Sequence, residues 1–388
     1  MNPNAEFDVI VHGATGFTGR LVAEHFAKHH PHIRWAMSGR DADKLAAVRD
    51  EIEAPADTPL IVADADSPAS LRRMVAQAKA AVTTVGPYQL YGSDLVAACA
   101  ETGTDYLDLC GEPAWMRQMI DAHDRTAKDS GARILFSCGF DSIPFELGVW
   151  VVQQEAAKRF GGPVARVKGR VRAMRGTFSG GTAASLKATM AAAARDPQVL
   201  EYLKDPFALT PDFAGPKQPH GAAVAYDDDL GLWTAPFVMA AINTRNVHRS
   251  NWLMDQPYGA DFVYDEMFLT GPGEAGEAAA KAVSAATAGM GAEGGPKPGE
   301  GPSKEEREAG FYDLLFVAIA DDGRQVRASV KGDKDPGYGS TSKMIAETAL
   351  CLIDTPAVAG GIWTPGAALR GKLVERLGAK AGLVFAVE

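Results

Sequence analysis

Short apolar runs alternate with amphipathic segments through the first 160 residues of the chain. The continuous apolar runs, which predict buried strands, lie at 7–13, 33–39, 60–64, 80–86, 105–109 and 132–138. Helical periodicity marks 17–30, 41–52, 67–79 and the stretches near 93–102 and 114–129. Six such alternations predict an α/β fold, with a doubly wound parallel sheet covered on both faces.

The pattern changes after about residue 160. Residues 165–176 alternate as a half-solvated strand does, 179–194 predict a glycine-led helix, and 311–332 predict a hairpin that turns at "DDGR". These elements predict an inserted α+β domain. The Gly- and Pro-rich stretch near 289–303 predicts a mobile loop, and 339–353 predict a helix that packs back on the first domain. We therefore expect three parts, at 1–160, 161–338 and 339–388.

A glycine motif, "VHGATGFTGR", follows the first predicted strand. Its spacing is G-x-x-G-x-x-G, so Gly16 stands one position later than in the common dinucleotide fingerprint. In that fingerprint Gly13 would allow the tight turn, Gly16 the approach to a pyrophosphate, and Gly19 the packing of helix on strand. A tight connection without a ligand is the alternative. The strand before and the helix after favour a nucleotide site of the Rossmann type.

The residues between these glycines add phosphate donors. Thr15 and Thr18 carry hydroxyl groups that can donate to phosphate oxygens. The helix that begins at Phe17 offers free N–H groups and the positive end of its dipole. We therefore count Thr15, Phe17 and Thr18 among the cofactor-binding residues.

The tip of the second strand, "SGRDADKL", indicates which nicotinamide cofactor is bound. An NAD site usually has an acid here, whereas this chain has Ser38 and Arg40, with Lys44 one turn further on. A guanidinium and a hydroxyl suit a 2′-phosphate, so the sequence favours NADP over NAD. The alternative is that Arg40 is a solvated loop charge and Asp41 only caps the next helix.

The ends of later strands supply further candidates for the cofactor site. Asp64 closes the third strand and is placed to meet the adenine amino group, and Gly86 and Pro87 leave the fourth strand near the nicotinamide ribose. Cys110 and Gly111 follow the fifth strand and are expected to shape the nicotinamide end.

Three residues are candidates for the proton donor of a reductase. Tyr88 and Tyr91 follow the fourth strand, and Lys187 lies on the predicted helix 179–194. Aromatic packing is the alternative role of the two tyrosines.

Composition narrows the classes of function. The net charge of −10 and the lack of a basic block argue against nucleic acid as a partner. The four cysteines are widely separated and predict neither a metal site nor disulfides, which fits a reducing cytoplasm. The N-terminus lacks the features of a signal peptide, and no apolar run is long enough to cross a membrane.

Taken in order, "GATGFTG", "SGR", "VGPYQLYG", "YLDLCGE" and "CGFDSIPFELG" resemble the saccharopine dehydrogenase-like oxidoreductases. The likeness is clear over 7–160 and weaker at 179–186, 338–353 and 360–369. It is nearest to the branch with the mycobacterial trans-acting enoyl reductases and the animal saccharopine dehydrogenase-like oxidoreductase. It implies NAD(P)H as hydride donor and an inserted domain for substrate and dimer contacts, and hence a homodimer.

The resemblance leaves two substrate classes. In the enoyl reductase branch the substrate is a double bond in an acyl chain carried by a polyketide synthase, on the way to membrane glycolipids. True saccharopine enzymes act on C–N bonds of substrates with several carboxylates. Basic residues for such carboxylates stand at alternate positions from Arg166 to Arg172, where a solvated face is the other interpretation.

The segment "SCGFDSIPFELG" favours an apolar substrate. In the amino-acid enzymes of the family, the corresponding segment resembles G-x-D-P-G-x-x-H. This chain has Ile143, Pro144 and Phe145 in that segment and no histidine. Asp141 and Ser142 precede a helix, and we expect them to cap it.

A third hypothesis is a non-catalytic, nucleotide-bound scaffold on a membrane or a synthase. Leu369, Leu373, Leu377, Ala381 and Val384 fall near one face of the last segment, beside basic residues. That face suits peripheral membrane contact. Docking on the protein's own core is the alternative, and we favour it.

Overall fold

The first half of the chain builds the parallel sheet that its pattern predicts. The computed structural model describes residues 5–176, 180–288 and 300–388. The strand order of this sheet is β13-β6-β5-β4-β1-β2-β3, and every neighbouring pair is parallel. Its strands are β1 (Phe7–His12), β2 (Trp35–Gly39), β3 (Leu60–Val62), β4 (Ala78–Thr83), β5 (Asp105–Leu107), β6 (Arg133–Leu135) and β13 (Gly361–Trp363).

Seven helices connect and cover these strands. They are α1 (Phe17–His29), α2 (Ala42–Glu51), α3 (Pro68–Val75), α4 (Tyr88–Tyr91), α5 (Ser93–Thr102), α6 (Pro113–Ser130) and α7 (Ile143–Phe160). Asp41 caps α2 as expected, since its carboxylate accepts the Lys44 N–H at 3.0 Å. The helix predicted over 67–79 ends earlier, at Val75, because Ala78 already pairs with Phe7 in the sheet.

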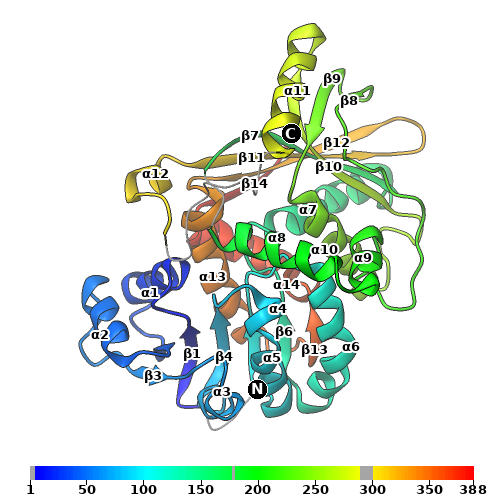
Figure 1. Cartoon of the computed structure of the whole chain (residues 1–388). Coiled ribbons are helices and arrows are strands. Elements are labelled where there is room, and N and C mark those ends of the chain that lie inside the picture. Colours follow the sequence, from blue (N-terminus) through cyan, green and yellow to red (C-terminus); the bar gives the residue numbers. More distant parts are fainter. Residues whose placement is uncertain (1–4, 177–179, 289–299) are drawn as a thin grey trace.

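A second, mixed sheet lies above the first (Figure 1). Its order is β14-β12-β11-β7-β10-β9-β8, with one parallel pair, β7 and β10. Its strands are β7 (Arg166–Arg175), β8 (Ala225–Asp227), β9 (Leu232–Pro236), β10 (Val263–Gly271), β11 (Phe311–Ile319), β12 (Gln325–Gly332) and β14 (Leu383–Val387). The helices of this part are α8 (Gly180–Ala193), α9 (Pro197–Lys204), α10 (Ala240–Leu253), α11 (Gly273–Ala288) and α12 (Lys304–Glu308).

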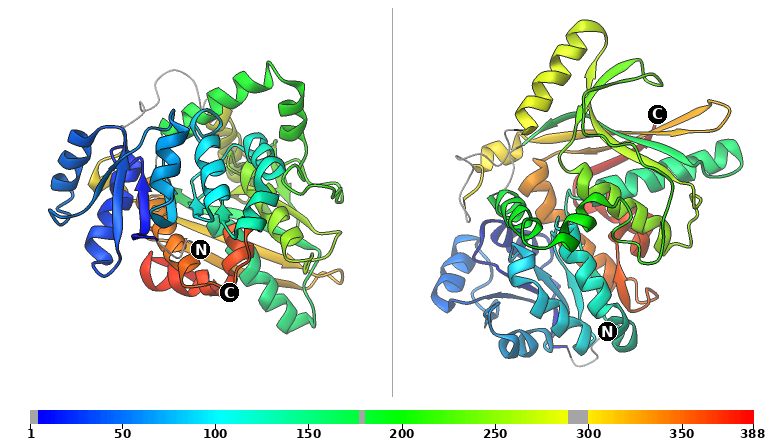
Figure 2. Two further views of the ribbon diagram at one scale, coloured as in Figure 1. Left: turned by 90° about the horizontal axis from the view of Figure 1, so that it is seen from below. Right: turned by 45° about the vertical axis from the view of Figure 1, so that its right-hand side comes forward.

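Helices fill the space between the two sheets, as the views of Figure 2 also show. The helix α7 leaves the first sheet and packs under β11 and β12 of the second. Gly148 makes that approach close, because a Cβ there would stand 2.1 Å from Cε2 of Phe316. The predicted loop near 289–303 falls mostly outside the described residues, and Ser303 caps α12 through a capping box with Glu306.

The C-terminal segment joins both sheets. A short π-helical turn, η1 (Pro336–Ser340), leads into α13 (Thr341–Ile353), and α14 (Pro365–Lys380) follows. The strand β13 extends the first sheet and β14 extends the second, which the sequence pattern did not predict. The helix α13 packs against α1 and β4 of the first part.

The apolar face of the last segment packs on the protein's own core, as favoured above. Leu369, Leu373, Leu377 and Ala381 are all buried, while Val384 lies 59% exposed on the edge strand β14. Within the described ranges, no helix is both long and apolar enough to span a bilayer.

Candidate functional site

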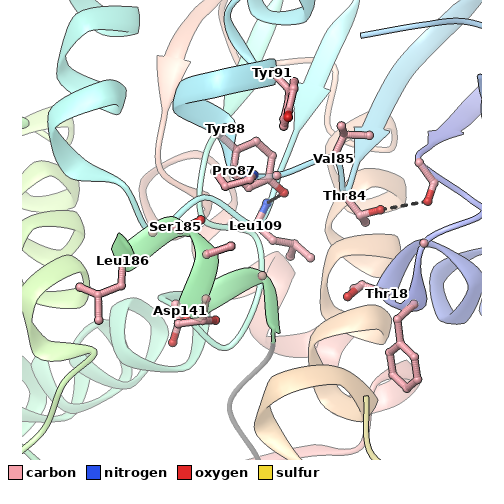
Figure 3. A pocket seen from close by; sticks show the side chains of 18 of the residues that line it. Thr18, Thr84, Val85, Pro87, Tyr88, Tyr91, Leu109, Asp141, Ser185 and Leu186 are labelled. Carbon is pink, nitrogen blue, oxygen red and sulfur yellow. Dashed lines mark hydrogen bonds between the residues drawn. The ribbon is translucent and has the colours of Figure 1, made fainter. Parts of the chain in front are cut away.

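A cleft of about 710 Å³ opens at the carboxyl ends of the parallel strands. The loops after β1, β2, β3 and β4 form one side of it, and α8 and α10 of the second part form the other (Figure 3). Ligands of doubly wound folds bind at this edge, so the fold places the cleft where a dinucleotide is expected.

The glycine loop has the geometry of a pyrophosphate cradle. Gly13 has φ +86°, and a Cβ there would lie 2.7 Å from Cγ2 of Val85. A Cβ on Gly19 would lie 2.1 Å from the Gly13 carbonyl oxygen, so the close packing of α1 on the turn requires glycine. Gly16 lines the cleft, and a Cβ there would lie 3.3 Å from the Gly13 carbonyl oxygen.

The start of α1 is open to an anion. Gly16 occupies the N-cap position without a side-chain cap, and the first turn carries no acid. Its N–H groups and dipole therefore suit a phosphate, and Thr15 and Thr18 line the cleft beside them. Phe17 also lines the cleft and packs edge-on against Tyr338, with ring centroids 4.7 Å apart. These residues fit the pyrophosphate of a bound dinucleotide.

Two of the four residues predicted for the adenosine end line the cleft. Arg40 and Asp64 are exposed at its wall. Ser38 is instead buried, and its hydroxyl donates to Sδ of Met74 at 3.0 Å, so it does not reach a ligand. Lys44 points to solvent, with 72% of its side chain exposed. The prediction for Ser38 is wrong, because its side chain is buried within the first part and bonded to Met74. Lys44 does not line the cleft, and its contact with a phosphate stays a prediction.

The loop after β4 forms the inner end of the cleft. Gly86 and Pro87 line it, as does Tyr91, which is 40% exposed. Tyr88 also lines it, but its hydroxyl donates to the Thr83 carbonyl at 3.2 Å and accepts the Leu109 N–H at 3.1 Å. Burial holds the pKa of Tyr88 well above its usual value, and both hydrogen bonds tie its hydroxyl to backbone groups, so its role as a proton donor stays a prediction.

Lys187 is exposed on the outer side of α8 and does not line the cleft, so its prediction as a proton donor is also wrong. Because α8 is largely apolar, its sequence does not indicate which of its faces lines the cleft. The cleft side of α8 carries Ser185, two residues before Lys187.

Glu112 organises this end of the cleft. The carboxylate is buried and accepts the backbone N–H groups of Tyr88 and Gln89, each at 2.9 Å. It also accepts the Ser185 hydroxyl at 2.7 Å. Cys110 is fully buried behind it, and its Sγ accepts the Glu112 N–H at 3.3 Å, whereas Gly111 lines the cleft. The prediction for Cys110 is therefore wrong for direct contact with a ligand.

Asp141 is a functional candidate that sequence reasoning assigned only to a helix cap. Its side chain lines the cleft beneath α8 (Figure 3), and its Oδ1 is buried with no hydrogen-bond partner among the described residues. Burial raises its pKa to about 7. Asp141 therefore holds or releases a proton near neutral pH. The sequence offered only the loop position before a helix as a signal.

Arg245 is a second residue that the sequence did not single out. It lies on α10, lines the cleft and is 7% exposed. Its two Nη atoms donate to the carbonyls of Ala241 and Leu203, while Nε has no partner in the described structure. Burial lowers its pKa to about 10, so the group stays charged at neutral pH. A buried cation of this kind suits a polarised or anionic oxygen of a ligand.

The basic row on β7 is neutralised from within the protein. Lys168 and Arg170 are buried and share Asp227, at 2.7 and 2.9 Å. Arg166 bonds Asp265, and Arg172 bonds Asp313 at 2.7 Å. The row is thus neither a solvated face nor a free pocket for substrate carboxylates.

One group of side chains has the composition of a metal site, although the sequence predicted none. His25 and His30 each place Nε2 on the same Oε1 of Glu347, at 2.7 and 2.6 Å. The other oxygen of Glu347 accepts from Nε of Arg376 at 2.8 Å. This cluster lies outside the cleft and ties α1 to α13 and α14.

Comparison with known proteins identifies the family of the chain. Residues 9–135 match the family model of the saccharopine dehydrogenase NADP binding domain. A putative trans-acting enoyl reductase of Mycobacterium tuberculosis is 39% identical over 399 residues, which cover 96% of this chain and 95% of that protein. A trans-acting enoyl reductase of Mycobacterium ulcerans is 38% identical over 400 residues and 96% of each chain.

Two solved structures share the fold over the whole chain. Saccharopine dehydrogenase (L-Glu forming) of Saccharomyces cerevisiae is 10% identical, with a TM-score of 0.54 over 98% of this chain and 99% of its own. The homospermidine synthase of Legionella pneumophila, solved with NAD, is 8% identical with a TM-score of 0.55, over 99% and 91%. The chain belongs to the saccharopine dehydrogenase-like oxidoreductases, in the branch of the trans-acting enoyl reductases, and is an NAD(P)-dependent enzyme.

Proposed function

We propose that the protein is an NADPH-dependent reductase of a carbon–carbon double bond conjugated to the carbonyl of an acyl substrate. The observation that carries this proposal is the unpaired carboxyl group of Asp141, which lines the same cleft as the glycine loop. The names of the relatives at 38 and 39% identity support the enoyl class.

Arg40 supports NADPH as the preferred donor. It stands at the tip of β2, where an acid would otherwise bind the ribose 2′-hydroxyl of NAD, and it lines the cleft. Its guanidinium is exposed and makes no hydrogen bond that would compete with a 2′-phosphate within the described residues. A planar guanidinium binds phosphate through two parallel hydrogen bonds.

The described residues divide the work of a conjugate reduction. NADPH, when bound, supplies a hydride, which forms the new C–H bond at the carbon distal to the carbonyl. Asp141 gives its proton to the carbon next to the carbonyl and is left as a carboxylate. Arg245 is the cation available to stabilise negative charge on the carbonyl oxygen. The products are the saturated acyl group and the oxidised cofactor.

The rest of the cleft suits an acyl chain. Leu109, Val238, Met239 and Ile242 line it near Asp141 and Arg245. Apolar walls lower the polarity around Asp141, which favours the protonated form of its carboxyl group. The substrate would be a thioester, either free or held by the carrier of a synthase.

The saccharopine-type alternative has less support. A substrate with several carboxylates needs several unpaired cations, and the basic row on β7 is already paired with aspartates. Arg245 supplies one cation, which is too few for a substrate with several carboxylates. A non-catalytic scaffold would bind NADPH without turning over any substrate.

Titration of the protein with NADPH and NADH, followed by turnover assays, tests the proposal. We expect saturable NADPH binding and NADPH consumption with 2-enoyl thioesters, but none with 2-oxo acids and amines. Turnover of 2-oxo acids with amines, without turnover of enoyl thioesters, would indicate a saccharopine-type dehydrogenase instead. Binding without turnover of either would favour the scaffold.

A further inference from the structure

A second, smaller cavity of about 100 Å³ lies next to the cleft and is lined by Asp141 as well. The two cavities share Thr18, Leu109, Asp141, Thr182 and Met239. The carboxyl group of Asp141 therefore stands at the junction between them. Beyond the junction, the walls are mostly apolar and include Phe140, Met174, Phe237 and Pro336.

The aromatic walls of this side pocket are held in place by other rings. Phe140 packs edge-on against Tyr312 and Phe145, with centroids 4.9 and 5.5 Å apart. Phe237 packs against Phe145 at 5.6 Å and against Phe268 at 5.0 Å. Met174 is different, since it lies half-buried on β7 and has a flexible side chain. The pocket therefore has a fixed shape on one side and an adjustable wall at Met174.

We propose that this side pocket is the subsite for a short alkyl group on the carbon next to the substrate carbonyl. The inference rests on the proposed function. If Asp141 protonates that carbon, the carbon must lie against its carboxyl group, which is where the pocket begins. A second substituent on the same carbon then has an apolar space to enter. The substrate class is a 2-alkyl-2-enoyl thioester.

The size of the pocket limits the group. Its volume of about 100 Å³ is small beside the volume of about 710 Å³ of the main cleft. A methyl or ethyl group fits this space, whereas a long chain must stay in the main cleft. One methylene group in an apolar pocket changes kcat/KM by about 10- to 200-fold. We therefore expect the enzyme to have a measurably higher kcat/KM for the branched substrate.

Paired substrates and paired variants test the inference. We compare kcat/KM for 2-butenoyl and 2-methyl-2-butenoyl thioesters in the wild-type enzyme, in Met174→Trp, which fills the pocket, and in the near-isosteric control Met174→Leu. We expect the methylated substrate to be preferred at least about tenfold by the wild type and the control. Met174→Trp should lose this preference while it retains turnover of 2-butenoyl thioester. Met174→Phe replaces it if the tryptophan variant does not fold.

Equal kcat/KM values in the wild type, or a preference that survives in Met174→Trp, would overturn the subsite. Failure of the proposed function has a different signature, because then neither thioester is turned over. In that case, the dissociation constants of butanoyl and 2-methylbutanoyl thioesters, measured by calorimetry with NADP⁺ present, decide the inference. Tighter binding of the branched compound that is lost in Met174→Trp supports the subsite. Equal binding overturns it.

Discussion

The hydroxyl of Ser185 donates a 2.7 Å hydrogen bond to Oε1 of Glu112, and this contact joins α8 of the second part to the loop after β5. The same carboxylate accepts two backbone N–H groups at the start of α4. A single buried carboxylate thus fixes the two helices between which the inner end of the cleft is formed.

Glu112→Gln should weaken this arrangement. An amide offers only one acceptor oxygen, so at least one of the three donors loses its partner inside the protein. We expect the free energy of unfolding to fall by about 1–3 kcal/mol, as chemical denaturation would show, together with a lower kcat/KM. Ser185→Ala removes one donor with its bond and should cost less than Glu112→Gln. Unchanged stability of Glu112→Gln would contradict this role.

Asp141→Asn should separate activity from stability. The amide cannot give up a proton to carbon, so kcat should fall by about 10²- to 10⁴-fold. The fold disfavours the charged carboxylate, so the neutral variant should be at least as stable as the wild type at pH above 7. Thermal unfolding and NADPH consumption measure the two effects. A variant with wild-type turnover would remove Asp141 from the mechanism.

The raised pKa of Asp141 also predicts a pH profile. Its pKa of about 7 keeps the acid protonated below that pH. The stability tied to this group is fully present below the usual Asp pKa of about 4 and is lost as the pH rises through about 7. We expect kcat/KM to decline above pH 7, because Asp141 loses its proton there. The residual activity of Asp141→Asn should not show this decline. A profile that stays flat from pH 6 to pH 9 would contradict the assignment.

Arg40→Ala should change the choice of cofactor. Loss of the guanidinium removes the contact to a 2′-phosphate, so NADPH affinity should fall about tenfold or more while NADH affinity changes little. Lys44→Ala is the matched control, because Lys44 is a cation one turn away that does not line the cleft. Fluorescence titration measures the affinities of the wild type and of both variants for NADPH and NADH. Equal losses of affinity for NADPH and NADH would show that Arg40 does not bind the 2′-phosphate.

Glu347→Gln should loosen the C-terminal segment from the first sheet. The buried carboxylate accepts from His25, His30 and Arg376, and these bonds hold its pKa well below the usual range. That stability is present above the usual Glu pKa of about 4 and declines as the pH falls further. We expect a loss of about 3 kcal/mol at pH 7 by denaturant titration. The control is Glu24→Gln, which removes an exposed pair with Lys28 and should cost well under 1 kcal/mol.

Hydrophobic periodicity and local turn chemistry determined the first sheet and the glycine loop. Short continuous apolar runs that alternate with amphipathic helices are typical of strands buried on both faces, and the turn at Gly13 and Gly19 leaves no room for a side chain. These are short-range constraints, so the sequence alone predicts them. The helical spacing of the apolar residues in the last segment fits both a membrane surface and the protein's own core, and the fold buries them in the core.

Tertiary structure decided which polar side chains meet a ligand. Ser38, Cys110 and Lys187 each stand next to a cleft-lining residue in sequence, and Lys44 lies one turn after Arg40, yet none of the four lines the cleft. The two C-terminal strands, which join different sheets, depend on pairings far apart in sequence.

The role of Asp141 was decided in the same way. Its sequence context is that of an ordinary helix cap. Only the packing of the second part over the first sheet buries its carboxyl group without a partner, and that desolvation makes it an acid at neutral pH.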